Sequence, residues 1–203
     1  MQHFIETYNE VVSPSDCNTI IEYFESQEDR HYEGCYSLDG QVIVNPSVKD
    51  STDILMNLTV DNDCTNILVP VINQCTELYR EKYSSVDIIS NWSADPQYNI
   101  QRYYPNQGYH GVHCEDSSPS TNRVMGWSLY LNTITDGGGT IFPEYKLKID
   151  AEVGKFAIFP AYWTHSHYGI PSPTQTKYII TGWYIYVEDF PTIEDTSFVN
   201  SSW

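Results

Sequence analysis

Residues 154–183 read GKFAIFPAYWTHSHYGIPSPTQTKYIITGW, two apolar runs separated by a stretch rich in histidine, glycine, proline and serine. Runs of Phe, Ile, Tyr and Trp with such interruptions are typical of short strands joined by turns. The same pattern extends back along the chain, and it predicts strands over 97–104, 110–115, 125–132, 139–142, 155–159 and 177–187. Many short strands with turns between them predict an antiparallel sandwich or barrel.

The first 90 residues have a mixed pattern that contains two helical segments. Residues 13–16, Ser-Pro-Ser-Asp, form a helix start signal, and apolar residues then recur at helical spacing as far as Phe24. A second helical pattern covers about 65–83, and Pro70 indicates that this helix begins or kinks there. Helices first and strands later, without alternation of the two, exclude a doubly wound parallel sheet.

These patterns together predict a mainly β (α+β) fold, a double-stranded β-helix or jelly roll with supporting N-terminal helices. We expect residues 1–90 to be a helical and mixed support region of the same domain. Residues 91–190 would be the jelly-roll core, and residues 191–203 an acidic, serine-rich tail.

Composition and charge limit the functions that this chain can have. Its 203 residues are 40% hydrophobic and include 17 Tyr, enough apolar material for one domain with a real core. The net charge of −17 gives a surface that repels phosphate backbones and anionic lipids, so neither nucleic acid nor a membrane is an expected partner. The five cysteines form no C-x-x-C pair, and no signal peptide is visible, so we expect a reduced, cytoplasmic protein.

A short motif in the middle of the chain has the residue types of a metal site. In the expected strand over 110–115, His113 and Glu115 are two residues apart and would project from one face. Together with a second imidazole, from His165 or His167, they would make a facial set of ligands that leaves positions open on iron(II). The spacing alone is weak, because a histidine and a glutamate on a strand surface are common.

Lys177 is the only lysine or arginine in residues 156–203, and it opens an apolar and aromatic run. One interpretation is an exposed lysine on an edge strand. A lone cation that faces into an apolar barrel would instead need an anionic partner, which a dicarboxylic acid would supply. With the period of a strand, Lys177 shares a face with Thr181 and Trp183.

Further motifs precede the quoted segment in a fixed order: QRY at 101–103, GY at 108–109, HCE at 113–115, YLN at 130–132 and GGGTIF at 137–142. In this order, residues 101–183 resemble the iron(II)- and 2-oxoglutarate-dependent dioxygenases. Within that family they are most similar to the prolyl 4-hydroxylase-like branch, including its marine phage-type members.

The resemblance implies a catalytic Fe(II) centre held by His113, Glu115 and a distal histidine. His167 has the family's H-x-G-x-P context and lies ten residues before Lys177, which favours it over His165. Glu115 departs from the aspartate that is commoner in prolyl hydroxylases. The additional methylene would shift the metal slightly while the charge and the oxygen donor are kept.

The resemblance also implies a binding site for 2-oxoglutarate. Lys177 would pair with the far carboxylate of this cosubstrate through a charge-assisted hydrogen bond. Tyr103 would donate a hydrogen bond to it, with the adjacent Tyr104 as the alternative register. Thr181 and Trp183 would line the pocket.

The implied activity is O2-dependent hydroxylation of an unactivated C–H bond, foremost prolyl 4-hydroxylation of a proline-containing peptide or protein. Succinate and CO2 would be released, ascorbate would serve as reductant, and a phage-encoded enzyme would act in the host cytoplasm. Two other classes stay open. A cupin-like metal-binding jelly roll, whether an isomerase or a noncatalytic module, would need no 2-oxoglutarate and no Lys177. A virion or carbohydrate-binding jelly roll with incidental histidines would bind no metal.

Overall fold

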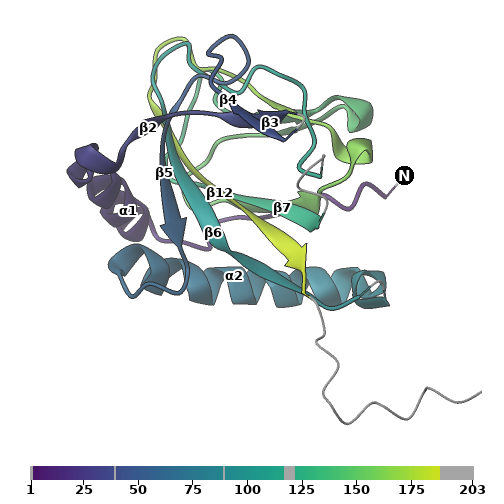
Figure 1. Ribbon diagram of the computed structural model, residues 1–203. Coiled ribbons are helices and arrows are strands. Elements are labelled where there is room, and N and C mark those ends of the chain that lie inside the picture. Colours follow the sequence, from purple (N-terminus) through teal and green to yellow (C-terminus); the bar gives the residue numbers. More distant parts are fainter. Residues whose placement is uncertain (1, 39, 89, 117–121, 188–203) are drawn as a thin grey trace, which may run out of the picture.

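The structure, a computed structural model, describes residues 2–38, 40–88, 90–116 and 122–187. The predicted tail over 191–203 lies outside these residues. Within them the chain forms antiparallel sheets and two α-helices, so the predicted mainly β fold, a double-stranded β-helix with N-terminal helices, is confirmed (Figure 1). In the same part of the chain, no helix is long and apolar enough to cross a membrane.

In the described residues the elements are mostly short strands, with the two α-helices and four short 3₁₀ helices between them. In chain order they are β1 (Glu6–Tyr8), α1 (Pro14–Ser26), η1 (Glu28–Arg30), β2 (Tyr32–Glu33), β3 (Tyr36–Leu38), β4 (Gln41–Ile43), β5 (Thr52–Asn57), α2 (Asp63–Lys82), η2 (Ser84–Ile88), β6 (Trp92–Tyr103), β7 (Arg123–Tyr130), β8 (Thr140–Phe142), η3 (Pro143–Tyr145), β9 (Leu147–Ile149), β10 (Phe156–Pro160), η4 (Trp163–His165), β11 (Tyr168–Gly169) and β12 (Lys177–Tyr186).

The largest sheet has seven strands in the order β1-β10-β7-β12-β6-β5-β2, and all of its pairings are antiparallel. A three-stranded sheet, β11-β8-β9, and the β3–β4 hairpin complete the β structure. Figure 1 shows α2 running beneath the large sheet and the β3–β4 hairpin on the opposite side. The last strand, β12, therefore lies at the centre of the large sheet, between β6 and β7.

Alternation along the strands separates two hydrophobic cores. On β10, Phe156 and Ile158 pack with the helices, whereas Ala157 and Phe159 pack with the three-stranded sheet. Successive side chains of a strand point to opposite faces, so each strand of the large sheet serves both cores. The odd-numbered residues of β12 face the second core, and this is the side on which the predicted site residues of β12 lie.

Both helices begin at side-chain caps. The Ser13 hydroxyl accepts a hydrogen bond from the backbone N–H of Asp16, as the start signal predicts. Asn62 caps α2 in the same way, and this helix starts at Asp63. Of the two alternatives for Pro70, a helix start there is therefore wrong, and a kink there stays a prediction. The proline lies inside the helix, where its missing N–H removes one hydrogen bond of the helical series.

The strand predicted over 110–115 is wrong as well. The backbone N–H groups of His110 and Gly111 both donate to the carbonyl of Val48, at 2.8 and 3.1 Å. Two successive N–H groups that share one acceptor bend the chain, whereas in a strand they would point to opposite edges. The segment is therefore a loop packed against the chain that precedes β5.

The first 90 residues contain five short strands, β1 to β5, that the helical pattern does not reveal. β5 pairs with β6, from Thr52↔Arg102 to Asn57↔Gln97, and β1 pairs with β10. Both strands thus extend the large sheet. β1 to β4 have only two or three residues each, too few side chains to display a period of two. β5 has six residues, but its sequence TDILMN does not alternate between apolar and polar side chains, so the sequence predicts only the helices there.

Substitution of Gly182 on β12 tests how closely the buried ring of Trp127 packs against this strand. A Cβ atom at this position would lie 2.3 Å from Cζ2 of Trp127, a ring that is 1% exposed. We expect Gly182→Ala to lower the free energy of unfolding by about 1–3 kcal/mol, measured by urea denaturation, because the buried indole must shift. Gly169→Ala is the matched control, since its Cβ would meet nothing closer than 3.5 Å. Equal stability of the two variants would contradict the packing described.

Candidate active site

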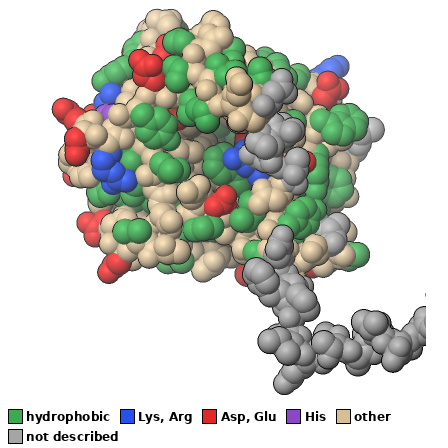
Figure 2. All heavy atoms as spheres, viewed as in Figure 1, with side chains coloured by type: hydrophobic (Ala, Val, Ile, Leu, Met, Phe, Trp, Pro, Cys, Tyr) green, Lys and Arg blue, Asp and Glu red, His purple; other side chains and the backbone are tan. Residues whose placement is uncertain are grey.

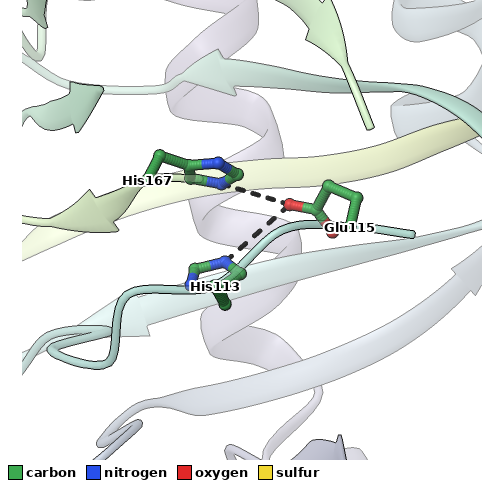
Figure 3. A group of neighbouring side chains, drawn as sticks. All are labelled: His113, Glu115 and His167. Atoms are coloured by element: carbon green, nitrogen blue, oxygen red, sulfur yellow. Dashed lines mark ion pairs between the residues drawn. The ribbon is translucent and has the colours of Figure 1, made fainter. Parts of the chain in front are cut away.

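Two loops bring the three candidate ligands together. His113 and Glu115 lie in the loop between β6 and β7, and His167 follows the η4 turn. The backbones of His113 and His167 form an isolated antiparallel bridge, with N–H···O distances of 3.0 and 2.8 Å in the two directions. Figure 3 shows the three side chains pointing toward one another from these loops. The backbone bridge thus assembles the cluster without the predicted strand.

The donor atoms of the cluster fit a single metal ion. One ligand atom from each residue lies within 4.8 Å of the other two. Oε1 of Glu115 is 3.3 Å from Nε2 of His167 and 3.9 Å from Nε2 of His113. Three donors at these separations, an oxygen and two nitrogens, are the facial set that suits Fe(II) with open positions.

Hydrogen bonds on the far side of each imidazole set the direction of its lone pair. Nδ1 of His113 lies 2.9 Å from the carbonyl of Gly111, and Nδ1 of His167 lies 3.0 Å from the carbonyl of His165. A carbonyl can only accept, so each Nδ1 carries a proton. In a neutral ring Nε2 then directs a lone pair at the Glu115 carboxylate, whereas in an imidazolium ring Nε2–H donates a hydrogen bond to it. Lone pairs facing one another require a positive species between them, a proton or a metal ion.

The electrostatics of the cluster favour the protonation states of metal ligands. Burial, reinforced by the charge of His167, lowers the pKa of the His113 imidazole to about 4. Burial alone would raise the pKa of the Glu115 carboxyl. The hydrogen bond and charge of His167, together with the charges of His113 and Arg123, outweigh that effect and hold this pKa well below its usual range. A neutral His113 and an ionised Glu115 at neutral pH are the forms that bind metal.

His165 makes its side-chain hydrogen bonds outside the cluster. Its Nε2 donates to the carbonyl of His3 at 2.7 Å, and its Nδ1 lies 2.9 Å from the hydroxyl of Thr164. His165 and His167 are two residues apart, which in a strand would place both on one side, but the η4 turn ends at His165 and redirects the chain. Both ring nitrogens of His165 thus have partners outside the cluster, and the structure brings His167 into it.

The cluster opens into a cavity of about 300 Å³ between the large sheet and the β3–β4 hairpin. Figure 2 shows a hollow near the middle of the view, with hydrophobic side chains around it. Lys177, Tyr103, Thr181 and Trp183 all line the cavity, as do the three residues of the cluster. The predicted cosubstrate residues therefore share one space with the candidate metal ligands.

Lys177 is a buried cation without an anionic partner among the described residues. Its side chain is 5% exposed, and Nζ lies 4.4 Å from the centre of the Tyr103 ring. Burial lowers the pKa of this ammonium group to about 8. Tyr103 is 4% exposed, whereas Tyr104 is 47% exposed and stacks with Arg102. The register of β6 thus turns Tyr103, and not Tyr104, toward the lysine.

A buried ion pair at the cavity and Arg123 are not predicted from the sequence. Lys49 and Asp53 form a buried ion pair at 2.6 Å, and Ser51 and Gln101 donate further hydrogen bonds to the same carboxylate. Arg123 lines the cavity beside Trp183. A charged residue inside the apolar strand β5 is the signal that could have indicated the Asp53 pair, because buried carboxylates need partners. The sequence offers no comparable signal for Arg123.

The fold and the site together define a class of protein. A double-stranded β-helix with a partly buried His-Glu-His cluster and a buried lysine in one cavity is an arrangement that suits a mononuclear iron oxygenase with a dicarboxylate cosubstrate. Residues 98–185 match the sequence profile of the 2OG-Fe(II) oxygenase superfamily. This match covers 88 of the 203 residues, less than half of the chain.

Solved structures share the fold at low sequence identity. A viral collagen prolyl hydroxylase from Paramecium bursaria Chlorella virus-1, in complex with 2OG, is 19% identical with a TM-score of 0.62 over 91% of this chain and 97% of that chain. A Pseudomonas putida prolyl-4-hydroxylase is 12% identical with a TM-score of 0.66 over 92% of this chain and 95% of the other.

A Trichoplax adhaerens prolyl hydroxylase, in complex with a peptide fragment of the hypoxia inducible factor oxygen degradation domain, is 17% identical. Its TM-score is 0.68 over 91% of this chain and 84% of that chain. No curated protein matches the chain in sequence. At these identities the structural matches establish the fold alone.

The unpaired charge of Lys177 leads to a test by substitution. We expect Lys177→Met to raise the free energy of unfolding at pH 7 by about 1–3 kcal/mol, because a buried ammonium without a partner is replaced by an apolar side chain of similar length. Urea denaturation of both proteins measures the difference. A Lys177→Met variant that is less stable than the wild type would show that the lysine has a structural partner.

The pH dependence of the stability that Lys177→Met gains follows from the lowered pKa of Lys177. The pKa of Lys177 is lower in the folded protein, about 8, than its ordinary value of 10.5. The folded state therefore binds fewer protons than the unfolded state between these values, and wild-type stability rises with pH there. The advantage of Lys177→Met should be complete below pH 8 and vanish near pH 10.5.

Proposed function

We propose that this protein is an Fe(II)- and 2-oxoglutarate-dependent dioxygenase that hydroxylates an unactivated C–H bond and releases succinate and CO2. The observation that carries the proposal is the shared cavity, in which a His-Glu-His cluster and an unpaired buried lysine lie together. A cupin-like metal site without a cosubstrate would leave the charge of Lys177 uncompensated.

Each residue of the cavity has a role in this proposal. His113, Glu115 and His167 would hold the iron, which, when bound, supplies the redox chemistry that couples O2 to 2-oxoglutarate. Lys177 would bind and orient the far carboxylate of the cosubstrate, with Tyr103 donating a hydrogen bond beside it. Thr181 and Trp183 would line the pocket, and ascorbate would keep the iron reduced.

The substrate that we propose is a prolyl residue of a peptide or protein, hydroxylated at C4. The similar structures are prolyl hydroxylases, one of them with a bound peptide fragment, and this supports the choice. The aromatic rings of Tyr109 and Trp183 at the cavity suit contact with a proline ring and the exclusion of water. We place the protein in the phage-type branch of prolyl 4-hydroxylases, acting in the host cytoplasm.

The proposal also divides the chain by role. Residues 91–190 would carry the chemistry, and residues 1–90 would support them within the same domain. This division agrees with the cover that α1 and α2 give to the large sheet and with the pairing of β1 and β5 at that sheet.

Anaerobic titration with Fe(II) and 2-oxoglutarate tests the centre. The wild type should develop the weak visible charge-transfer band of a metal-bound cosubstrate. His113→Ala and His167→Ala should lose it, because each removes an imidazole of the cluster, whereas His165→Ala should keep it. Lys177→Met should require about 30-fold more 2-oxoglutarate, the effect of losing a buried charge pair. A wild type without the band would refute the oxygenase proposal.

Mass spectrometry of a proline-containing peptide tests the substrate. With Fe(II), 2-oxoglutarate, ascorbate and O2, we expect the peptide to gain one oxygen atom at proline, with one succinate formed per hydroxylation. The same peptide with alanine in place of proline is the control. If succinate formation responds to a different substrate and prolyl peptides stay unmodified, the prolyl assignment is wrong while the oxygenase class stands.

A further inference from the structure

Three residues form a row across three strands on the cavity face of the large sheet. Gly126 on β7 is the register partner of Phe159 on β10 and of Trp183 on β12. Side chains of directly paired residues point to the same side of a sheet, so the row has an aromatic residue on each side of a glycine. We call Phe159, Gly126 and Trp183 the glycine slot.

The side chain of Glu115 occupies this slot. A Cβ atom on Gly126 would lie 3.0 Å from Cγ of Glu115 and 2.7 Å from Cε2 of Phe159. Glycine therefore leaves the space in which the methylene groups of the glutamate pass over the sheet. The Phe159 ring fills the rest of the space and packs against His167, with their ring centres 4.8 Å apart.

Trp183 holds one oxygen of the carboxylate. Its indole N–H donates to Oε2 of Glu115 at 2.7 Å. Arg123 lies 3.7 Å over the same indole ring and donates to the backbone carbonyl of Glu115 at 3.0 Å. With Oε2 held by the indole, Oε1 is the oxygen that faces Nε2 of both histidines.

We propose that the glycine slot is a positioning element matched to a glutamate ligand: Gly126 admits the longer side chain, and Trp183 fixes Oε2 so that Oε1 alone is presented to the metal. This inference rests on the proposed metal site. An aspartate at position 115 would keep the charge, but its carboxylate would end about 1.5 Å short and lose the indole hydrogen bond. Trp183 is thus a positioning residue that acts through Glu115.

Titration with Mn(II) alone, followed by electron paramagnetic resonance, tests the slot without turnover. Trp183→Phe keeps an aromatic ring beside Arg123 and removes the N–H donor together with part of the indole ring. We expect it to weaken Mn(II) binding by about 10- to 100-fold, the usual effect of losing a hydrogen bond to a metal ligand. Trp163→Phe is the matched control, because Trp163 is 78% exposed and should leave the affinity unchanged.

Glu115→Asp provides the second arm of the test. It should weaken Mn(II) binding by about tenfold or more, and Trp183→Phe added to it should cost little more, because the hydrogen bond is already lost. Thermal unfolding of the metal-free variants separates these effects from a loss of folding, since a merely structural role would lower stability and leave the affinity of the folded protein intact.

The outcomes distinguish the proposed metal site from the proposed role of the glycine slot. A wild type that binds no Mn(II) would overturn the metal centre and the slot together. A wild type that binds Mn(II), with Trp183→Phe or Glu115→Asp of equal affinity, would overturn the slot alone. Independent, additive losses from the two substitutions would also overturn it, because they would show that the indole does not act through the glutamate.

Discussion

The burial of unbalanced charge is the constraint on which the site depends. Lys177 is buried beside Tyr103 without a carboxylate among the described residues, whereas the Glu115 carboxylate has Arg123 at 3.8 Å and accepts from the indole of Trp183. The buried ammonium costs stability unless an external anion completes the site. The sheet that holds both in place must therefore be stabilised elsewhere, and its two hydrophobic cores do this.

Several of the few cations of the chain lie at the cavity. The chain has ten lysines and arginines against 27 acidic residues, yet Lys49, Arg123 and Lys177 all line one cavity. Glu115 is the one acidic residue among the described residues of that lining. Lys49 is paired with Asp53, and Arg123 lies 3.8 Å from Glu115. Lys177 is therefore the cation of this lining that no described carboxylate balances, and its charge would favour the entry of an anionic ligand.

Sequence reasoning predicts the parts of the site that depend on regular periods. The faces of β12 follow from the alternation of a strand, and Lys177, Thr181 and Trp183 line one cavity as that alternation requires. The choice between His165 and His167 does not follow from a regular period. The two residues would share one face of a strand, and they point in different directions only because the η4 turn ends at His165. Likewise, the hydrogen bond from Gln101 to Asp53 depends on the register between β5 and β6, which no local pattern specifies.

The bridge between the backbones of His113 and His167 has a consequence for how a metal ion would enter. The two residues are far apart in the sequence, and paired peptide groups join their loops directly. The conformational entropy of ordering those loops is therefore lost when the chain folds, and not when the ion arrives. A metal site whose loops are ordered in advance could release and rebind an ion without local unfolding of those loops.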